Sequence, residues 1–448
     1  MALKTLRVPS ILKSSLELLL MASFCLPGKR LSLLIVGFLC FDLLANSASA
    51  APLTLSGGLI NKLSDNTAQS SSNEITDIET RANLRVSHLS DPGRCSSETL
   101  ADLGYGIWHE KTFDPETYTS LDFQGGCDLG RGFSWELSDN LRDVALDSGG
   151  TDTPDNTTRK NVFRTGPSYT LSFTQIDQLQ LSAKYENTEF SEPEEADSER
   201  YVASAAWNHL FSQSLSAGIS LSTNQAEFDT GAEIDTDVAS VIFSKTWSTT
   251  RIAGSLGVSQ IESDFGGSSQ SSDGWVGNIE LERDINPVTL FYLNASREFT
   301  DQTSDFDIRF GEFVFDLREL SEVEVTAIDT GVRRRFKDAS QLEISVFANR
   351  ADYIRANETE DGLGLSIGYR RPVIPLLTFN STLRYQYETF DVDNVDQETA
   401  SLDAALTYEL TRDLGITGRI GHTTRTSDAP TSEYEENWIL IGLDYRFF

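Results

Sequence analysis

After residue 50, apolar and polar side chains alternate with a period of two over many segments. In 360–370, for example, Leu363, Leu365, Ile367 and Tyr369 alternate with glycine and serine. A β-strand directs successive side chains to opposite faces, so such a segment is a strand with one apolar face and one small, polar face. Helical spacing is rare in the same region, and the pattern therefore predicts an all-β fold.

Twenty segments carry this pattern, and short and long polar connections alternate between them. This is the hairpin rhythm of a transmembrane β-barrel, with short periplasmic turns and long acidic outer loops. Because the segment 308–320 alternates only in part, it predicts an extra hairpin, a folded loop or a segment turned into the lumen, and we expect 16–20 antiparallel strands. The predicted strands are 53–61, 77–88, 98–109, 116–124, 131–139, 161–174, 178–189, 200–211, 214–227, 236–247, 250–262, 273–283, 287–298, 321–334, 339–350, 361–371, 374–387, 398–409, 413–423 and 436–448.

A soluble β-sandwich or β-propeller would also show alternation, but strand length and the polar face favour the barrel. Strands of soluble sheets average only about 5–6 residues, roughly half the length of the segments found here. The non-apolar face is rich in Gly, Ser, Thr, Asn, Gln and Arg, which suits a wet lumen, and no blade-length repeat recurs. The membrane barrel, covering residues 51–448, is therefore the favoured architecture.

The N-terminus predicts export. Lys29 and Arg30 precede an apolar run at 31–45, and Ala48 and Ala50 then stand in the spacing of a signal-peptidase site. We expect residues 1–50 to be a signal peptide cleaved after Ala50. An N-terminal membrane anchor is the less favoured alternative, because Asp42 interrupts the apolar run. After residue 50 no stretch is apolar enough for a transmembrane helix.

Two cysteines, Cys95 and Cys127, remain in the mature chain and form a candidate disulfide pair in an oxidising compartment. No second Cys or His lies at ligand spacing near either one, so neither a metal site nor a cofactor is expected there. The acidic segment 229–237 offers Asp229, Glu233, Asp235 and Asp237 to calcium. It lacks the spacing of known calcium loops, and a solvated loop is the favoured interpretation.

The formal net charge is −32, and no block rich in Lys or Arg is present. Nucleic-acid binding is therefore not expected, because phosphate-binding surfaces are basic. Against this acidic background, four arginines fall on predicted inward positions of the last third: Arg333, Arg370, Arg384 and Arg419. They are either residues of a pore constriction, as in general porins, or lumen ion pairs that stabilise the wall.

A catalytic role is not expected. Barrel enzymes need a nucleophile or carboxylates set beside a histidine. The nearest arrangement is Asn208, His209 and Ser212, which falls on a predicted periplasmic turn.

The chain ends in "NWILIGLDYRFF" without a polar tail. Counted back from the penultimate residue, one face carries only apolar side chains, whereas a register set by Phe448 would place Asp444 and Arg446 in lipid. The pattern resembles the C-terminal signature of Gram-negative outer-membrane proteins, which implies recognition by the barrel assembly machinery. The residues of this predicted assembly signal are Ile439, Ile441, Leu443, Tyr445 and Phe447.

The segments 53–86, with its "SDN" turn, and 135–143 resemble the outer-membrane proteins called putative beta-barrel porin 2. Members of that family are often encoded beside exopolysaccharide genes, so the resemblance implies a role in exporting or anchoring surface polysaccharide, with secretion components as partners. It supplies no catalytic motif. Taken together, we expect a cofactor-free barrel in the Gram-negative outer membrane, in contact with lipid and lipopolysaccharide. Its expected function is a porin-like conduit, and the alternative is a closed structural or surface-anchoring barrel.

Overall fold

The computed structural model describes residues 53–91, 93–147, 149–193, 195–303, 308–310, 313–315, 322–391, 395–429 and 432–448. The expected signal peptide and its cleavage site at Ala48 and Ala50 lie outside these residues. Among the described residues, no helix is long and apolar enough to span a membrane.

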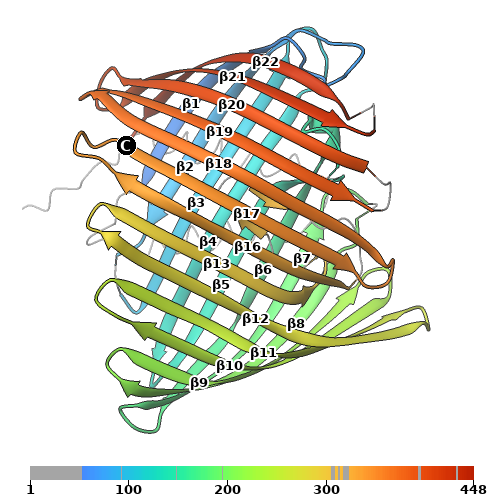
Figure 1. The fold of residues 1–448 in the computed structure, drawn as a ribbon, viewed down its shortest axis with the longest axis vertical. Coiled ribbons are helices and arrows are strands. Elements are labelled where there is room, and N and C mark those ends of the chain that lie inside the picture. Colours follow the sequence, from blue (N-terminus) through green and yellow to red (C-terminus); the bar gives the residue numbers. More distant parts are fainter. Residues whose placement is uncertain are drawn as a thin grey trace, which may run out of the picture. The chain divides into compact units, whose positions relative to one another are not determined.

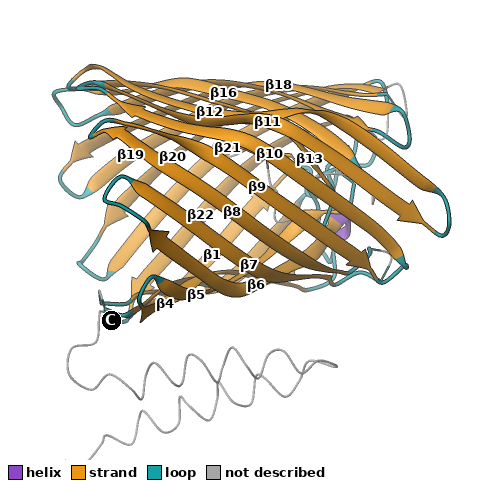
Figure 2. Ribbon diagram, turned by 90° about the horizontal axis from the view of Figure 1, so that it is seen from below, coloured by secondary structure: helices purple, strands orange, loops and turns teal. Residues whose placement is uncertain are grey.

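Twenty strands form a single antiparallel sheet that closes into a barrel, as the alternation predicted (Figures 1 and 2). Each strand pairs with its neighbours in sequence, except that β13 pairs with β16 across a separate small hairpin, β14–β15. The strands of the barrel are β1 Thr54–Ser64, β2 Asp77–Leu89, β3 Cys95–Trp108, β4 Glu116–Gly130, β5 Phe133–Ala145, β6 Thr157–Ser172, β7 Asp177–Phe190, β8 Ser198–Ser212, β9 Leu215–Phe228, β10 Ala232–Thr246, β11 Thr250–Phe265, β12 Ser269–Asn286, β13 Thr289–Thr300, β16 Val323–Arg335, β17 Gln341–Tyr353, β18 Glu358–Ile374, β19 Leu377–Phe390, β20 Val395–Glu409, β21 Leu414–Ser427 and β22 Tyr434–Arg446.

The barrel closes where β22 pairs with β1, from Ser56 opposite Arg446 to Ser64 opposite Trp438. Beyond β22 the pairing continues, because Phe447 N donates to the Leu55 carbonyl (2.8 Å) and Leu55 N donates to the Phe448 carbonyl (3.0 Å). The last two residues therefore belong to the ladder. Closure leaves the sheet without an unpaired edge, which a barrel in lipid requires.

The two ends of the barrel differ in their connections. At one end, called here the turn end, lie the start of β1, the C-terminal residue and connections of two to five residues. At the other, the loop end, connections run from three to 22 residues. In outer-membrane barrels short turns face the periplasm and longer loops face outside, which assigns the turn end to the periplasm.

Several segments expected as acidic loops are largely strand. In 229–237 only 229–231 connect β9 to β10, and in 263–273 only 266–268 connect β11 to β12. In 229–237 the acidic side chains alternate with the buried apolar residues Ala232 and Ile234. The ladder therefore runs on past the positions where polar composition suggested that it would stop.

The described residues of the segment 308–320, which alternated only in part, are not part of the twenty-stranded sheet. Its described residues form the hairpin β14 Ile308–Phe310 and β15 Phe313–Phe315, which pairs only with itself. The prediction for this segment was an arm of an extra hairpin, a folded loop or a segment turned into the lumen. In the structure both arms of a hairpin lie within the segment itself, and the barrel keeps its twenty strands.

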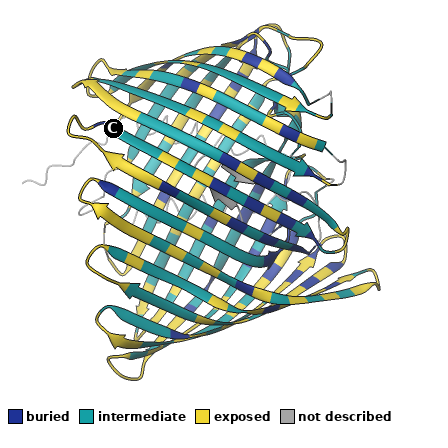
Figure 3. Ribbon diagram, in the orientation of Figure 1, coloured by how far each residue is buried: buried dark blue, intermediate teal, exposed yellow. Residues whose placement is uncertain are grey.

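Burial is concentrated at the loop end (Figure 3). Two clusters of buried apolar residues lie there, one on β16 and β17, which includes Val325 and Phe347, and one on β9 to β13, which includes Phe228 and Ile261. Outward-facing apolar residues are instead exposed, as lipid-facing side chains are in an isolated barrel: Leu221, Leu256 and Val258 are 54%, 61% and 63% exposed.

Candidate functional site

The lumen is the candidate site, because twenty strands enclose more space than side chains fill. Eight strands give an interior just wide enough for side chains, whereas barrels of 16–18 strands leave an aqueous channel. The residues that alternate with the lipid-facing ones point into this space. They include Gly, Ser, Thr and Asn and a set of paired charges on most of the strands.

Two of the four predicted lumen arginines meet on one carboxylate. Asp403 on β20 accepts from Arg419 on β21 (Nη2 to Oδ1, 2.9 Å) and contacts Arg384 on β19 (Nη1 to Oδ1, 3.4 Å). Arg419 also lies over the ring of Trp438, at 5.2 Å. The three charges form a compact triad with one net positive charge on the wall.

The other two predicted arginines lie apart from that triad. Arg333 on β16 makes a two-point ion pair with Glu343 on β17, at 2.8 and 3.0 Å. Arg370 on β18 is exposed near the turn end, opposite the uncharged Gln341 and Asn380. The four arginines therefore do not form one continuous stripe.

A second ionic group lies at the loop end and was not predicted from the sequence. Asp301, the first residue after β13, accepts from Nη2 of Arg200 on β8 with both carboxylate oxygens, each at 2.8 Å. The two side chains are almost fully buried, with 2% and 3% of their surfaces exposed. Four strands, β9 to β12, lie between β13 and β8 along the wall. The chain that leaves β13 therefore reaches a distant part of the lumen surface.

More hydrogen bonds hold the same connection against β6 to β8. The Thr303 carbonyl accepts from Thr188 on β7 (2.8 Å), and the Gln302 carbonyl accepts from Lys160 on β6 (2.9 Å). Thr303 also donates to Asp301, through its backbone N–H and its hydroxyl. The described start of the β13–β16 connection, residues 301–303, is thus anchored at several points.

Glu186 on β7 completes this group. Arg200 approaches it at 3.2 Å, and Arg164 on β6 donates to its other oxygen. Burial alone would raise the pKa of Asp301, but the Arg200 guanidinium and the hydrogen bonds from Thr303 outweigh it and hold that pKa below its usual value. Asp301 thus stays ionised beside Arg200 in a buried site. We call Arg164, Glu186, Arg200, Asp301 and Thr303 the buried ionic anchor.

Loops from other parts of the wall also pack over the loop end. Ile354 and Ala196, from the β17–β18 and β7–β8 connections, lie against the apolar cluster of β9 to β13. Arg355 stacks over the ring of Phe265 at 4.2 Å. The lumen is therefore narrowed at the loop end both by ionic and by apolar contacts.

Asn208, His209 and Ser212, the arrangement nearest to that of a barrel enzyme, lie in the turn-end part of β8. His209 contacts Asp177 (2.7 Å) and lies between the rings of Trp207 and Phe211. Asn208 falls on the opposite face of β8 by alternation. The strand itself therefore separates Asn208 from His209.

The acidic residues offered to calcium are also distributed along a strand. Glu233, Asp235 and Asp237 follow one another on one face of β10. Within the described ranges, no group of three or more His, Cys, Asp or Glu side chains is arranged to hold a metal ion.

The cysteines and the C-terminal residues lie where the sequence placed them. Cys95 on β3 and Cys127 on β4 are directly paired across the ladder near the turn end and are joined by a disulfide. The predicted assembly-signal residues share the outward face of the chain end, each between 44% and 59% exposed: Ile439, Ile441, Leu443, Tyr445 and Phe447. Tyr445 and Phe447 stack edge to face at 5.2 Å.

Solved structures similar to this chain are outer-membrane barrels. The FrpB iron transporter of Neisseria meningitidis, F5-1 variant, shares 10% identity over 91% of this chain and 84% of that chain, with a TM-score of 0.50. The siderophore receptor PirA of Pseudomonas aeruginosa shares 11% identity over 90% and 81%, with a TM-score of 0.45. At such identities the likeness concerns the fold alone, which is that of a Gram-negative outer-membrane barrel.

A search of curated proteins found no match. A family model does match the last part of the barrel, from β18 to the chain end, where the predicted assembly signal lies. Residues 365–447 thus match the family described as Putative beta-barrel porin 2, the family that the N-terminal segments had suggested.

Proposed function

We propose that this chain is a passive, porin-like conduit through the outer membrane. The observation that carries the proposal is the closed wall of twenty strands, with an apolar outward face and a polar inward face. Such a wall leaves a water-accessible lumen unless a further segment fills it. Among the described residues, the start of the β13–β16 connection reaches β6 to β8, and Gly150 of the β5–β6 connection accepts a hydrogen bond from Arg425 on β21.

The second candidate is a closed barrel that serves as a structural or surface-anchoring element. It is favoured by the buried ionic anchor and by the apolar clusters, since both narrow the loop end. The two candidates differ in one measurable property, which is the conductance of the barrel in its resting state.

Planar-bilayer recording of the purified protein tests the proposal. A conduit gives discrete conductance steps, and a wild-type protein that inserts but never conducts would contradict it. Arg200→Ala breaks the buried ionic anchor and should enlarge the steps, with Arg333→Ala as the matched control in an exposed ion pair. Steps seen only in Arg200→Ala would favour the closed barrel.

Association with exopolysaccharide export is part of the proposal through the family resemblance alone. Deleting the chromosomal copy and measuring surface polysaccharide tests it directly, and unchanged polysaccharide would contradict the association. The proposed partners are lipopolysaccharide around the wall and the assembly machinery at the C-terminal strand.

A further inference from the structure

One sector of the lumen wall, on β8 to β11, has no ionisable side chain along the middle of its strands. The inward positions of 204–208, 216–224, 236–244 and 253–259 define this sector, called here the neutral stripe. Apart from Val238 and Ile242, they are Ser, Thr, Gly, Ala or Asn. The stripe is therefore hydroxyl-bearing, uncharged and built from small side chains.

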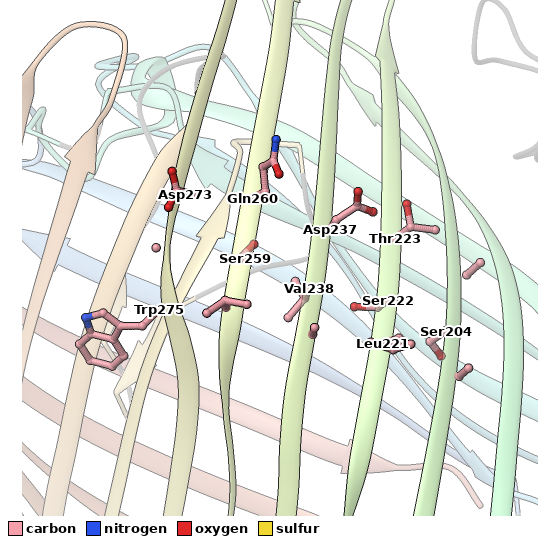
Figure 4. A pocket seen from close by; sticks show the side chains of 15 residues that line it. Ser204, Leu221, Ser222, Thr223, Asp237, Val238, Ser259, Gln260, Asp273 and Trp275 are labelled. Carbon is pink, nitrogen blue, oxygen red and sulfur yellow. The ribbon is translucent and has the colours of Figure 1, made fainter.

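Cross-strand register aligns part of the stripe into a row that continues onto β12. Ser204 pairs with Ser222, Ser222 with Val238, Val238 with Ser259, and Ser259 with Gly274. A cavity of about 1090 Å³ runs along this row and is lined by these five residues and the neighbours of each (Figure 4). Two of these neighbours, Asp237 and Asp273, are charged, and by alternation they belong to the opposite face of their strands. The small side chains leave this part of the wall open.

The strands that flank the stripe are charged on the same inward face. Lys184 on β7 makes an ion pair with Glu136 on β5, and Glu280 and Glu282 project from β12. Farther round the wall, Asp403 holds two arginines and Glu343 holds Arg333. Most of these charges are satisfied by one another, whereas the neutral stripe presents hydrogen-bonding groups without fixed charge.

We infer that the neutral stripe is the path of uncharged, hydroxyl-bearing solutes, an inference that rests on the proposed conduit function. A hydroxylated solute can exchange its hydrogen bonds with water for bonds to Ser, Thr and Asn at little net cost. A charged solute finds no compensating charge at the inward positions of the stripe, and elsewhere it must compete with existing ion pairs. Small side chains also give the stripe the room that a solute needs.

Solute uptake by proteoliposomes tests the inference. Swelling rates are compared for an uncharged disaccharide and for an anionic and a cationic solute of similar size. We expect the uncharged solute to enter several-fold faster than either charged one. Ser222→Trp should then strongly reduce that uptake, whereas Ser345→Trp, at an inward position on β17 outside the stripe, should leave it near the wild-type rate.

Conductance of the same preparations distinguishes a failure of the solute-path inference from a failure of the conduit proposal. A heat-modifiable gel shift verifies that each variant folds. Conductance without discrimination between the solutes, or equal losses in both Trp variants, would overturn the inference and leave the conduit intact. Absence of both conductance and swelling in a folded wild-type protein would overturn the conduit itself.

Discussion

The loop end and the turn end of the lumen are built from the same kinds of residues but are held together differently. At the loop end, Arg200 and Asp301 form an ion pair that is almost fully buried and joins segments far apart in sequence. Toward the turn end, Arg333 and Glu343 form an equally short pair with about half of the Arg333 side chain exposed, between adjacent strands. Arginine–carboxylate pairs thus anchor a chain segment in one place and line a wet wall in the other.

The difference shows that burial, more than geometry, decides how much an ion pair contributes to the free energy of folding. Exposed pairs contribute about 0–1 kcal/mol because water and salt screen them. Removing one partner of a buried pair costs about 3–5 kcal/mol, since the other charge is left without compensation. The loop end should therefore respond strongly to single substitutions and the turn end weakly, with one exception at the barrel seam.

The seam is that exception and carries the largest expected effect. Deleting Phe447 and Phe448 removes their backbone hydrogen bonds to Leu55 and the aromatic end of the assembly signal. We expect most of the protein to be lost from the outer membrane, as measured by membrane fractionation and the heat-modifiable gel shift. Phe448→Ala, which keeps the Phe447 register, should assemble far better, and equal loss in both would contradict that register.

The second-largest effect is expected for Arg200→Ala. It leaves Asp301 and Glu186 buried without their shared cation, so we expect a destabilisation of about 3–5 kcal/mol at the loop end. Limited proteolysis should cleave the β13–β16 connection faster than in the wild type. A double variant, Arg200→Ala with Asp301→Asn, should recover part of the protection, and no recovery would argue against the pairing.

Glu322 adds a pH-dependent effect of intermediate size at the other end of the same connection. It is fully buried beside Val323, and burial raises its pKa above the usual value even though Arg355 opposes the shift. A group with a raised pKa in the folded state contributes stability at low pH, and that contribution is lost as the pH rises.

Glu322→Gln should accordingly protect the connection at alkaline pH and change little near pH 4. The measurement is the proteolysis rate across a pH series. A variant that tracks the wild type at every pH would show that Glu322 does not control the stability of this segment.

The smallest effect is expected for Arg333→Ala. Its partner Glu343 stays solvated, so thermal stability should fall by about 1 kcal/mol or less. Loss of a lumen cation should instead shift the channel toward cations, which reversal potentials in a salt gradient measure. A large drop in thermal stability would contradict this prediction and show that the Arg333–Glu343 pair behaves like a buried ion pair.

The alternation predicted most of the strands of the wall. The predictions that were wrong concern strand ends in acidic segments, and they share one physical cause. Where one face meets lipid, as in Leu363, Leu365 and Ile367, local sequence is enough to place a strand. At 229–237 the strand continues beyond the apolar band of the wall. There Glu233 and Asp235 led to the prediction of a loop, because a solvated strand and a solvated turn have the same polar composition.

The ionic contacts were less predictable than the wall. Arg384 and Arg419 were recognised as lumen residues because each sits at a regular inward position of a clear strand. Their meeting on Asp403 depends on register between three strands. Nothing local to Arg200 or Asp301 marks them as partners, because 101 positions separate them and Asp301 lies outside any strand.

By itself the sequence determined the all-β class, the hairpin order and the outward register of the last strand. These depend on contacts with lipid and with the next strand, which a period of two encodes locally. Only the tertiary structure decided how residues 301–303 are anchored, which arginines share a carboxylate, and where the neutral stripe lies. Those features arise when a closed sheet brings distant inward positions together around one lumen, and no periodicity along the chain encodes that proximity.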